Sequence, residues 1–140
     1  MKALSPECRA FLLEEPRTGK VATVRADGRP HVAPVWFDLD EDSIIFTTWH
    51  TTVKAVNMRR DSRVCFCVDD ENPPYAYAQI EGTAVMTAEP EVLLYWATRI
   101  AGRYMGEELA EAYGKRNGVE GELLVRVTPK KVVFRRNIAD

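Results

Sequence analysis

The chain is poor in the residues that metal sites and disulfide frameworks require. It has two histidines, His31 and His50, and three cysteines, Cys8, Cys65 and Cys67, in 140 residues. An odd cysteine count, with no ligand spacing around the histidines, argues against both kinds of site, so we expect no metal. Cys65 and Cys67 are two positions apart on a predicted strand, and we interpret them as buried thiols on one face in a reducing compartment.

Long apolar runs and a strong excess of either charge are also missing. No apolar stretch approaches the length of a bilayer span, and the start MKALSPECRA lacks the apolar core of a signal peptide. The formal net charge of −2 gives no reason to expect nucleic-acid binding. These absences predict a soluble cytoplasmic protein that binds neither membranes nor nucleic acid, and 140 residues suffice for a single domain over residues 1–140.

Three extended runs follow one another between residues 21 and 48. VATVRA, HVAPVWFD and SIIFTT are rich in β-branched and aromatic residues and are bounded by turn-forming clusters. The pair Asp27-Gly28 can take the positive φ angles of a tight hairpin, and the acidic triplet 40–42 favours a second exposed turn. The segment therefore predicts an antiparallel meander of three strands.

Pro34 lies inside the second run. Because proline has no N–H to give to a sheet, this strand is predicted to lie at an edge or to carry a bulge. Backbone groups of Ala33, Val35 and Trp36 would then be free to bond the edge of a planar heterocycle. The alternative is an edge proline that only blocks aggregation.

Hydroxyls and an ammonium group follow the third run, in the segment TTWHTTVK. Residues 55–60 contain no helix breaker, so a short helix is expected, with Thr51 or Thr52 as its N-cap. A helix start offers unpaired N–H groups and a partial positive charge, which are what a phosphate requires. A solvated cap without a ligand is the alternative interpretation. The candidate phosphate ligands are Thr47, Thr48, Thr51, Thr52 and Lys54.

The order of these features resembles the split β-barrel flavin-binding superfamily of pyridoxamine phosphate oxidase. The similarity is carried by the DGRP hairpin, the VAPVWF strand, IIFTT, TxxK, NMRRDSRV and a later strand with EGTA, and it extends from about Thr18 to Arg135. The small type assigned to the deazaflavin coenzyme F(420) is the most similar. The resemblance implies a mainly β (α+β) fold, a split β-barrel with short flanking helices, that forms a homodimer.

The resemblance also implies a place for the cofactor. Its phosphate would be held by Thr47 or Thr48 and by Lys54, and its ring would lie along Pro34, Val35 and Trp36, close to a dimer partner. Many relatives have an arginine two residues before the lysine. This chain has Thr52 there, which removes one charge-assisted contact.

The implied function is a hydride transfer, in which the cofactor carries the chemistry and the protein supplies position and electrostatics. We expect an F(420)H2-dependent reductase of a conjugated small molecule such as an enone, a quinone or a tetrapyrrole-like acceptor. An FMN-binding oxidoreductase and a non-catalytic flavin or haem carrier are the alternatives. The sequence shows no acid and base paired at suggestive spacing. Tyr75 and Tyr77 are candidates for a proton donor, and the alternative is that they are ordinary strand aromatics.

Four further expectations concern the remaining chain. A helix opens at Ser5-Pro6 and stops at Pro16, burying Cys8, Phe11 and Leu12. Strands at 64–68 and 75–87 flank a loop at 69–74. Thr87 caps a helix that ends at Gly106 and packs on the barrel through Leu93, Trp96, Ala97, Ile100 and Tyr104. A short helix at 107–115, with Leu109, Ala112 and Tyr113 inward, precedes strands at 123–127 and 131–135.

Overall fold

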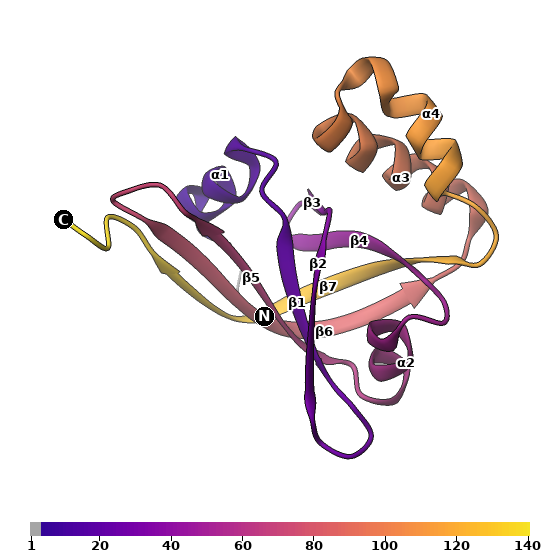
Figure 1. The fold of residues 1–140 in the computed structure, drawn as a ribbon, viewed down its shortest axis with the longest axis horizontal. Coiled ribbons are helices and arrows are strands. Elements are labelled where there is room, and N and C mark those ends of the chain that lie inside the picture. Colours follow the sequence, from indigo (N-terminus) through magenta and orange to yellow (C-terminus); the bar gives the residue numbers. More distant parts are fainter. Residues whose placement is uncertain (1–3) are drawn as a thin grey trace.

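The computed structural model describes residues 4–140, which form a seven-stranded antiparallel sheet with four helices around it (Figure 1). The predicted class, mainly β with short flanking helices, is confirmed. The strand order across the sheet is β2-β1-β5-β6-β7-β4-β3. In chain order the elements are α1 (Pro6–Glu14), β1 (Gly19–Val24), β2 (Pro30–Val35), β3 (Asp38–Asp40), β4 (Ser43–Trp49), α2 (Val53–Arg60), β5 (Arg63–Asp70), β6 (Ala76–Thr87), α3 (Pro90–Met105), α4 (Glu107–Asn117) and β7 (Glu122–Arg135).

The predicted meander is wrong, because the second extended run is two strands. β2 pairs with β1, whereas β3 pairs with β4 at the opposite edge of the sheet. The chain crosses between these edges at Trp36 and Phe37, which belong to neither strand. The sheet therefore curls so that its two edges approach the same short segment, and the edge position predicted for Pro34 is confirmed.

The turn between β1 and β2 differs from the expected tight pair. Gly28 has a φ of +89°, as a turn glycine allows, but Asp27 is not in the positive-φ region. The loop spans residues 25–29 and is closed by the Arg25 N–H donating to the Arg29 carbonyl at 2.9 Å. Three to five residues between strands is the next most common hairpin after the two-residue form.

Side chains on the concave side of the sheet form the main core. Alternation of buried and exposed residues along β6 shows how one face of each strand is apolar. Phe46 and Phe66 are fully buried with ring centroids 6.2 Å apart, and Phe37 meets Phe66 edge-on at 5.1 Å. Helix α1 closes one end of this core with Cys8, Phe11 and Leu12, as predicted.

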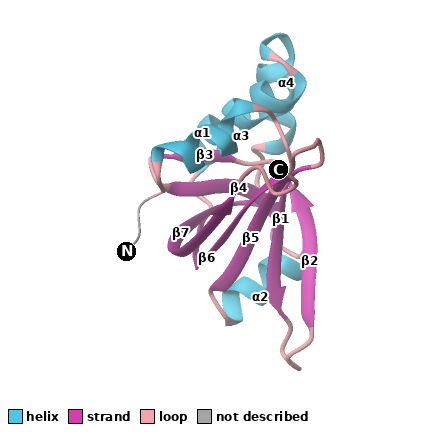
Figure 2. Cartoon of the chain, turned by 90° about the vertical axis from the view of Figure 1, so that its left-hand side faces the viewer, coloured by secondary structure: helices cyan, strands magenta, loops and turns pink. Residues whose placement is uncertain are grey.

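A second, smaller core joins α3 to the other side of the sheet. Leu93, Trp96 and Ile100 of α3 pack on Ile45 of β4 and Leu124 of β7, which confirms the predicted apolar stripe. Figure 2 shows α1, α3 and α4 gathered toward one end of the strands and α2 toward the other. None of the helices within residues 4–140 is both long enough and apolar enough to cross a bilayer.

The helical pair α3–α4 departs from the sequence prediction in two details. Glu89 is the N-cap of α3, without a side-chain bond, and the Thr87 hydroxyl instead accepts from the Glu89 N–H at 3.3 Å. Helix α4 extends to Asn117, and its buried residues are Ala110 and Gly114. The expected inward residues are wrong, since Leu109 and Ala112 are exposed and Tyr113 is half-buried.

The end of the chain also differs from expectation. The two strands predicted at 123–127 and 131–135 are one strand, β7, which passes Pro129 through an irregularity opposite Gly82. Cys65 and Cys67 do share one face of β5, but they are half-buried rather than buried, because they point away from the main core.

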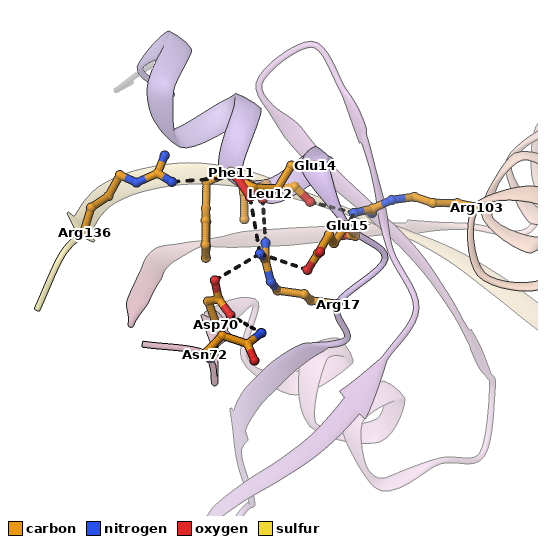
Figure 3. A network of polar contacts seen from close by, with 9 residues as sticks. All are labelled: Phe11, Leu12, Glu14, Glu15, Arg17, Asp70, Asn72, Arg103 and Arg136. Carbon is orange, nitrogen blue, oxygen red and sulfur yellow. Dashed lines mark hydrogen bonds and ion pairs between the residues drawn. The ribbon is translucent and has the colours of Figure 1, made fainter. Parts of the chain in front are cut away.

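Two residues at the end of α3 hold the segment that crosses between the sheet edges. Arg103 donates to the carbonyls of Leu12 and Phe37 at 2.6 and 2.5 Å. The Tyr104 hydroxyl accepts from the Phe37 N–H at 3.1 Å and donates to the Arg17 carbonyl at 2.9 Å. Figure 3 shows Arg103 reaching α1 beside the Arg17 cluster.

The Arg17 cluster secures the other side of α1. The Arg17 guanidinium donates to the Phe11 carbonyl at 3.1 Å and lies over the Phe11 ring at 4.6 Å. It also pairs with Glu14, Glu15 and Asp70 between 3.2 and 3.4 Å (Figure 3). Since its side chain is only 11% exposed, these contacts are less screened than surface pairs. The end of α1, β5 and the crossing segment are thus linked by charge-assisted bonds.

Candidate functional site

A cavity of about 200 Å³ lies where the end of β2, the middle of β4, the start of α2 and the α3–α4 pair meet. It brings together five of the eight predicted cofactor-binding residues with three from the helical pair. The lining residues are Pro34, Val35, Trp36, Thr47, Lys54, Ala97, Ile100 and Asn117.

One side of the cavity is an aromatic plate. The Trp36 indole stacks on the Tyr104 ring with centroids 5.1 Å apart and planes within 2°. Tyr104 is itself fixed by its two backbone hydrogen bonds, and burial raises the pKa of its hydroxyl. Ala97 and Ile100 complete the apolar wall. A planar ligand would therefore meet a rigid surface whose orientation is set before binding.

The other side of the cavity carries polar groups. Lys54 is the second residue of α2 and is half-buried, Thr47 faces the cavity from β4, and Asn117 ends α4. Burial lowers the pKa of Lys54, and the nearby charge of Glu122 opposes that shift. Among the residues that the structure describes, Lys54 is the one charged group on the cavity wall. An ammonium, a hydroxyl and an amide are donors suited to an anionic oxygen.

Glu122 stands behind this polar side, and the sequence analysis missed it. It is the first residue of β7 and pairs in register with Trp49 of β4. Burial raises the pKa of Glu122, while hydrogen bonding from Thr47 and the charge of Lys54 lower it. The signal in the sequence was an acid directly before the apolar residues LLV at the start of a strand.

The other three predicted phosphate ligands do not line the cavity. Of the two residues predicted as the N-cap of α2, it is Thr52 that caps the helix; its hydroxyl accepts from the Ala55 N–H at 3.3 Å and donates to the Trp49 carbonyl at 3.0 Å. The buried Thr48 hydroxyl lies 2.7 Å from that of Thr52. Thr51 is exposed. These hydroxyls shape the helix start, and their role in cofactor binding stays a prediction.

The tyrosine candidates lie away from the cavity wall within one chain. Tyr75 has a φ of +67°, is 43% exposed and precedes β6. Tyr77 is half-buried on β6, between Asp69 and Arg135 in the sheet register. Their role as proton donor remains a prediction. His50 does not line the cavity, and its Nδ1 lies 2.9 Å from the Gly121 carbonyl oxygen.

Residues from the α3–α4 pair were not predicted as part of the site. Ala97 and Ile100 were read only as packing residues, and Asn117 was not singled out. Their approach depends on close helix packing at Gly114, where a Cβ atom would stand 2.2 Å from the Thr98 hydroxyl oxygen. The pattern of small residues in EAYGKRNG was the available signal, because glycine permits such an approach.

The chain is similar to proteins of known family and structure. A family model described as pyridoxamine 5'-phosphate oxidase matches residues 4–136. A conserved hypothetical protein from Mycobacterium tuberculosis has a similar structure, with 26% identity, a TM-score of 0.82, and coverage of 100% of this chain and 94% of that one. A solved F(420) reductase shares 28% identity, with a TM-score of 0.73 and coverage of 92% and 98%.

A third solved structure shares the fold at lower identity. The haem storage protein HutZ from Vibrio cholerae is 19% identical, with a TM-score of 0.72 and coverage of 94% of both chains. These similarities confirm the split-barrel architecture expected from the sequence. With a family model that spans residues 4–136 and a curled seven-stranded sheet of the matching form, the chain belongs to the pyridoxamine 5'-phosphate oxidase family of flavin-binding split barrels.

Proposed function

We propose that the protein is an F(420)H2-dependent reductase that transfers a hydride from the deazaflavin to a conjugated small molecule such as an enone, a quinone or a tetrapyrrole-like acceptor. One observation carries the proposal: a single cavity joins the ammonium of Lys54 and the hydroxyl of Thr47 to the aromatic plate of Trp36. A phosphate at one end and a flat ring at the other are the two parts of a flavin-type cofactor.

The residues present fit such a cofactor, although the cavity encloses only part of one. Pockets that enclose a drug-sized ligand usually measure about 300–1,000 Å³, and this cavity measures about 200 Å³. Part of the ring would therefore lie outside the cavity, along the exposed edge at Pro34. We propose that a second copy of the chain covers it in a homodimer.

The residues that line the cavity have separate roles in this proposal. Lys54 and Thr47 bind and orient the phosphate, and the backbone near Pro34 and Val35 bonds the edge of the ring. Ile100 keeps water from the apolar side of the cavity. The bound deazaflavin, once reduced, supplies the hydride. The protein's contribution is to place the acceptor against the ring and to exclude water.

FMN is the alternative cofactor at the same residues. The deazaflavin is favoured here because a solved F(420) reductase shares 28% identity over 92% of this chain. A non-catalytic carrier would bind its ligand in the same cavity without catalysing hydride transfer.

Absorbance of the purified protein and titration with both cofactors test the proposal. We expect F(420) to bind and its reduced form to be oxidised when enones or quinones are added. Tight retention of FMN without deazaflavin binding would overturn the choice of cofactor. Binding of reduced F(420) without oxidation by any acceptor of the panel would instead favour the carrier.

A further inference from the structure

We propose that Asn117 is a third ligand of the cofactor phosphate, and that Arg116 orients its amide so that an N–H group faces the cavity. This inference rests on the proposed function, because it concerns the phosphate that Lys54 and Thr47 bind. It gives a role to helix α4, whose last residue lines the same cavity as those two residues. The anion is then contacted from three elements: β4, α2 and α4.

The end of α4 is held at the cavity by close packing on α3. Gly118, which follows Asn117, donates its N–H to the Gly114 carbonyl at 2.7 Å and closes the last turn. A Cβ atom on Gly118 would stand 3.1 Å from the Leu94 Cα and 3.3 Å from the Ala97 Cβ. Ala97 also lines the cavity. The backbone at Asn117 is therefore packed against α3, beside a residue of the cavity wall.

A hydrogen bond determines which end of the Asn117 amide is free. The Arg116 Nη1 donates to the Asn117 Oδ1 at 3.0 Å. An arginine side chain has donors only, so the atom that it contacts must be the amide oxygen. The Nδ2 group, with its two hydrogens, is then the end left for the cavity. In this orientation the amide can donate to a phosphate oxygen, whereas a flipped amide would present a lone pair.

The charges around the end of α4 are compatible with an anion. A helix C-terminus carries a partial negative charge, which by itself would repel a phosphate. The last turn of α4 contains Lys115 and Arg116, whose positive charges offset it. The Arg116 guanidinium also lies over the Tyr113 ring, with its Cζ 5.9 Å from the ring centroid. This contact keeps the guanidinium close to the helix end, next to Asn117.

Lys54 and Asn117 contribute differently to binding. Among the residues that the structure describes, Lys54 supplies the only charge on the cavity wall. Its ammonium is a point charge on a flexible stem, so it attracts the phosphate but imposes little direction. The amide of Asn117 is planar and is oriented by Arg116, so it selects where one phosphate oxygen lies. Loss of Asn117 therefore weakens binding of the phosphate without altering binding of the ring.

The test compares ligands that share a ring and differ in the phosphate: F(420) with its phosphate-free deazaflavin riboside, and FMN with riboflavin. Asn117→Leu removes the amide and keeps a side chain of similar size. Dissociation constants are measured by ring fluorescence, and circular dichroism with thermal melting establishes that each variant is folded. We expect the dissociation constant of the phosphate-bearing ligand to rise about tenfold, the lower end for a hydrogen bond to a charged group, and that of the phosphate-free ligand to change less than about twofold.

Substitutions of Arg116 test the orientation of the amide. Arg116→Lys keeps a donor and should bind all ligands as the wild type does. Arg116→Glu offers only acceptors, so the amide turns its Nδ2 toward the new carboxylate and presents its oxygen to the phosphate. Lys115→Glu is the matched control, because it makes the same charge change one residue earlier, also at an exposed position of α4.

We expect the phosphate-bearing ligand to lose about tenfold more affinity in Arg116→Glu than in Lys115→Glu. In the Asn117→Leu background, the two glutamate substitutions should cost the same affinity, since Arg116 acts through the amide. A purely structural role of Arg116 predicts no such dependence on Asn117. The Arg116 comparison changes only exposed positions, so it decides the orientation even if Asn117→Leu does not fold.

Two results would overturn the inference alone: equal changes for phosphate-bearing and phosphate-free ligands in Asn117→Leu, and equal losses in Arg116→Glu and Lys115→Glu while reduced F(420) is still oxidised. The proposed function fails alone when reduced F(420) is oxidised by no acceptor but FMN binding still depends on Asn117 and on the orientation set by Arg116. A wild type that binds none of the four ligands overturns both.

Discussion

Lys54 is the residue whose removal tests the anion site most sharply. Lys54→Met deletes the ammonium and keeps most of the aliphatic stem, so the cavity wall next to Thr47 stays filled. A charge-assisted bond contributes roughly 1.5–3 kcal/mol. The negative charge of Glu122 is then no longer opposed by that of Lys54, which places the expected loss toward the upper part of that range. The dissociation constant of F(420) should rise about 10- to 150-fold.

The assay is titration of the wild type and the variant with oxidised F(420), followed by its fluorescence. The phosphate-free deazaflavin riboside provides the ligand control, since its affinity should stay within about twofold. Lys115→Met provides the protein control, because Lys115 is an exposed lysine of α4 paired with Glu111. An unchanged dissociation constant in Lys54→Met, or an equal loss for the phosphate-free ring, would refute the assignment of Lys54 to the phosphate.

Three further predictions concern stability. Tyr104→Phe removes both backbone hydrogen bonds of the hydroxyl and should lower the free energy of unfolding by about 1–3 kcal/mol in urea titrations; an unchanged midpoint would show that the crossing segment does not depend on it. Gly114→Ala places a Cβ atom against Thr98 and should lower the melting temperature by several degrees, whereas a melting temperature equal to that of the wild type would contradict the packing described. For Glu122, whose pKa is raised by burial, the favourable contribution is present below the ordinary carboxyl pKa and is lost as pH rises through the raised value. The melting temperature of Glu122→Gln should therefore exceed that of the wild type at pH 8, and the difference should shrink toward pH 4. Lys54 is the nearby opposite charge that acts on Glu122. A difference in melting temperature that does not change with pH would contradict the burial argument.

Features set by near neighbours were predictable from the sequence. The N-cap at Thr52 depends on a hydroxyl and an N–H three residues apart, and both are visible in TTVKA. The edge position of Pro34 follows from the missing N–H of one residue. The apolar stripe on α3 follows from helical periodicity. In each case the physical cause lies within a few residues of the feature.

Strand pairing was not predictable in the same way. HVAPVWFD has the composition of one strand, yet the chain leaves one sheet edge at Val35 and enters the other at Asp38. The cause is distant in sequence, since Arg103 and Tyr104 hold Phe37 from more than 60 positions away. Periodicity indicates which face of a strand is buried but not which strand lies beside it.

The sequence predicted only those site residues that lie within one short segment of the chain. Pro34, Val35, Trp36, Thr47 and Lys54 come from 21 consecutive residues, whose motifs could be read together. The remaining lining residues and the acid behind them come from distant elements: Ala97, Ile100, Asn117 and Glu122. Their contribution depends on how the α3–α4 pair docks, and the inward face of α4 was mispredicted because its contact is made through small residues.

A crystal structure of the protein grown with excess F(420) would show where the cofactor phosphate and ring bind. We expect density in the cavity between β2, α2 and α3, with a phosphate oxygen in hydrogen-bond reach of the Lys54 Nζ and the ring against Trp36. A cofactor bound elsewhere on the sheet, or a phosphate that contacts neither Lys54 nor Thr47, would contradict it.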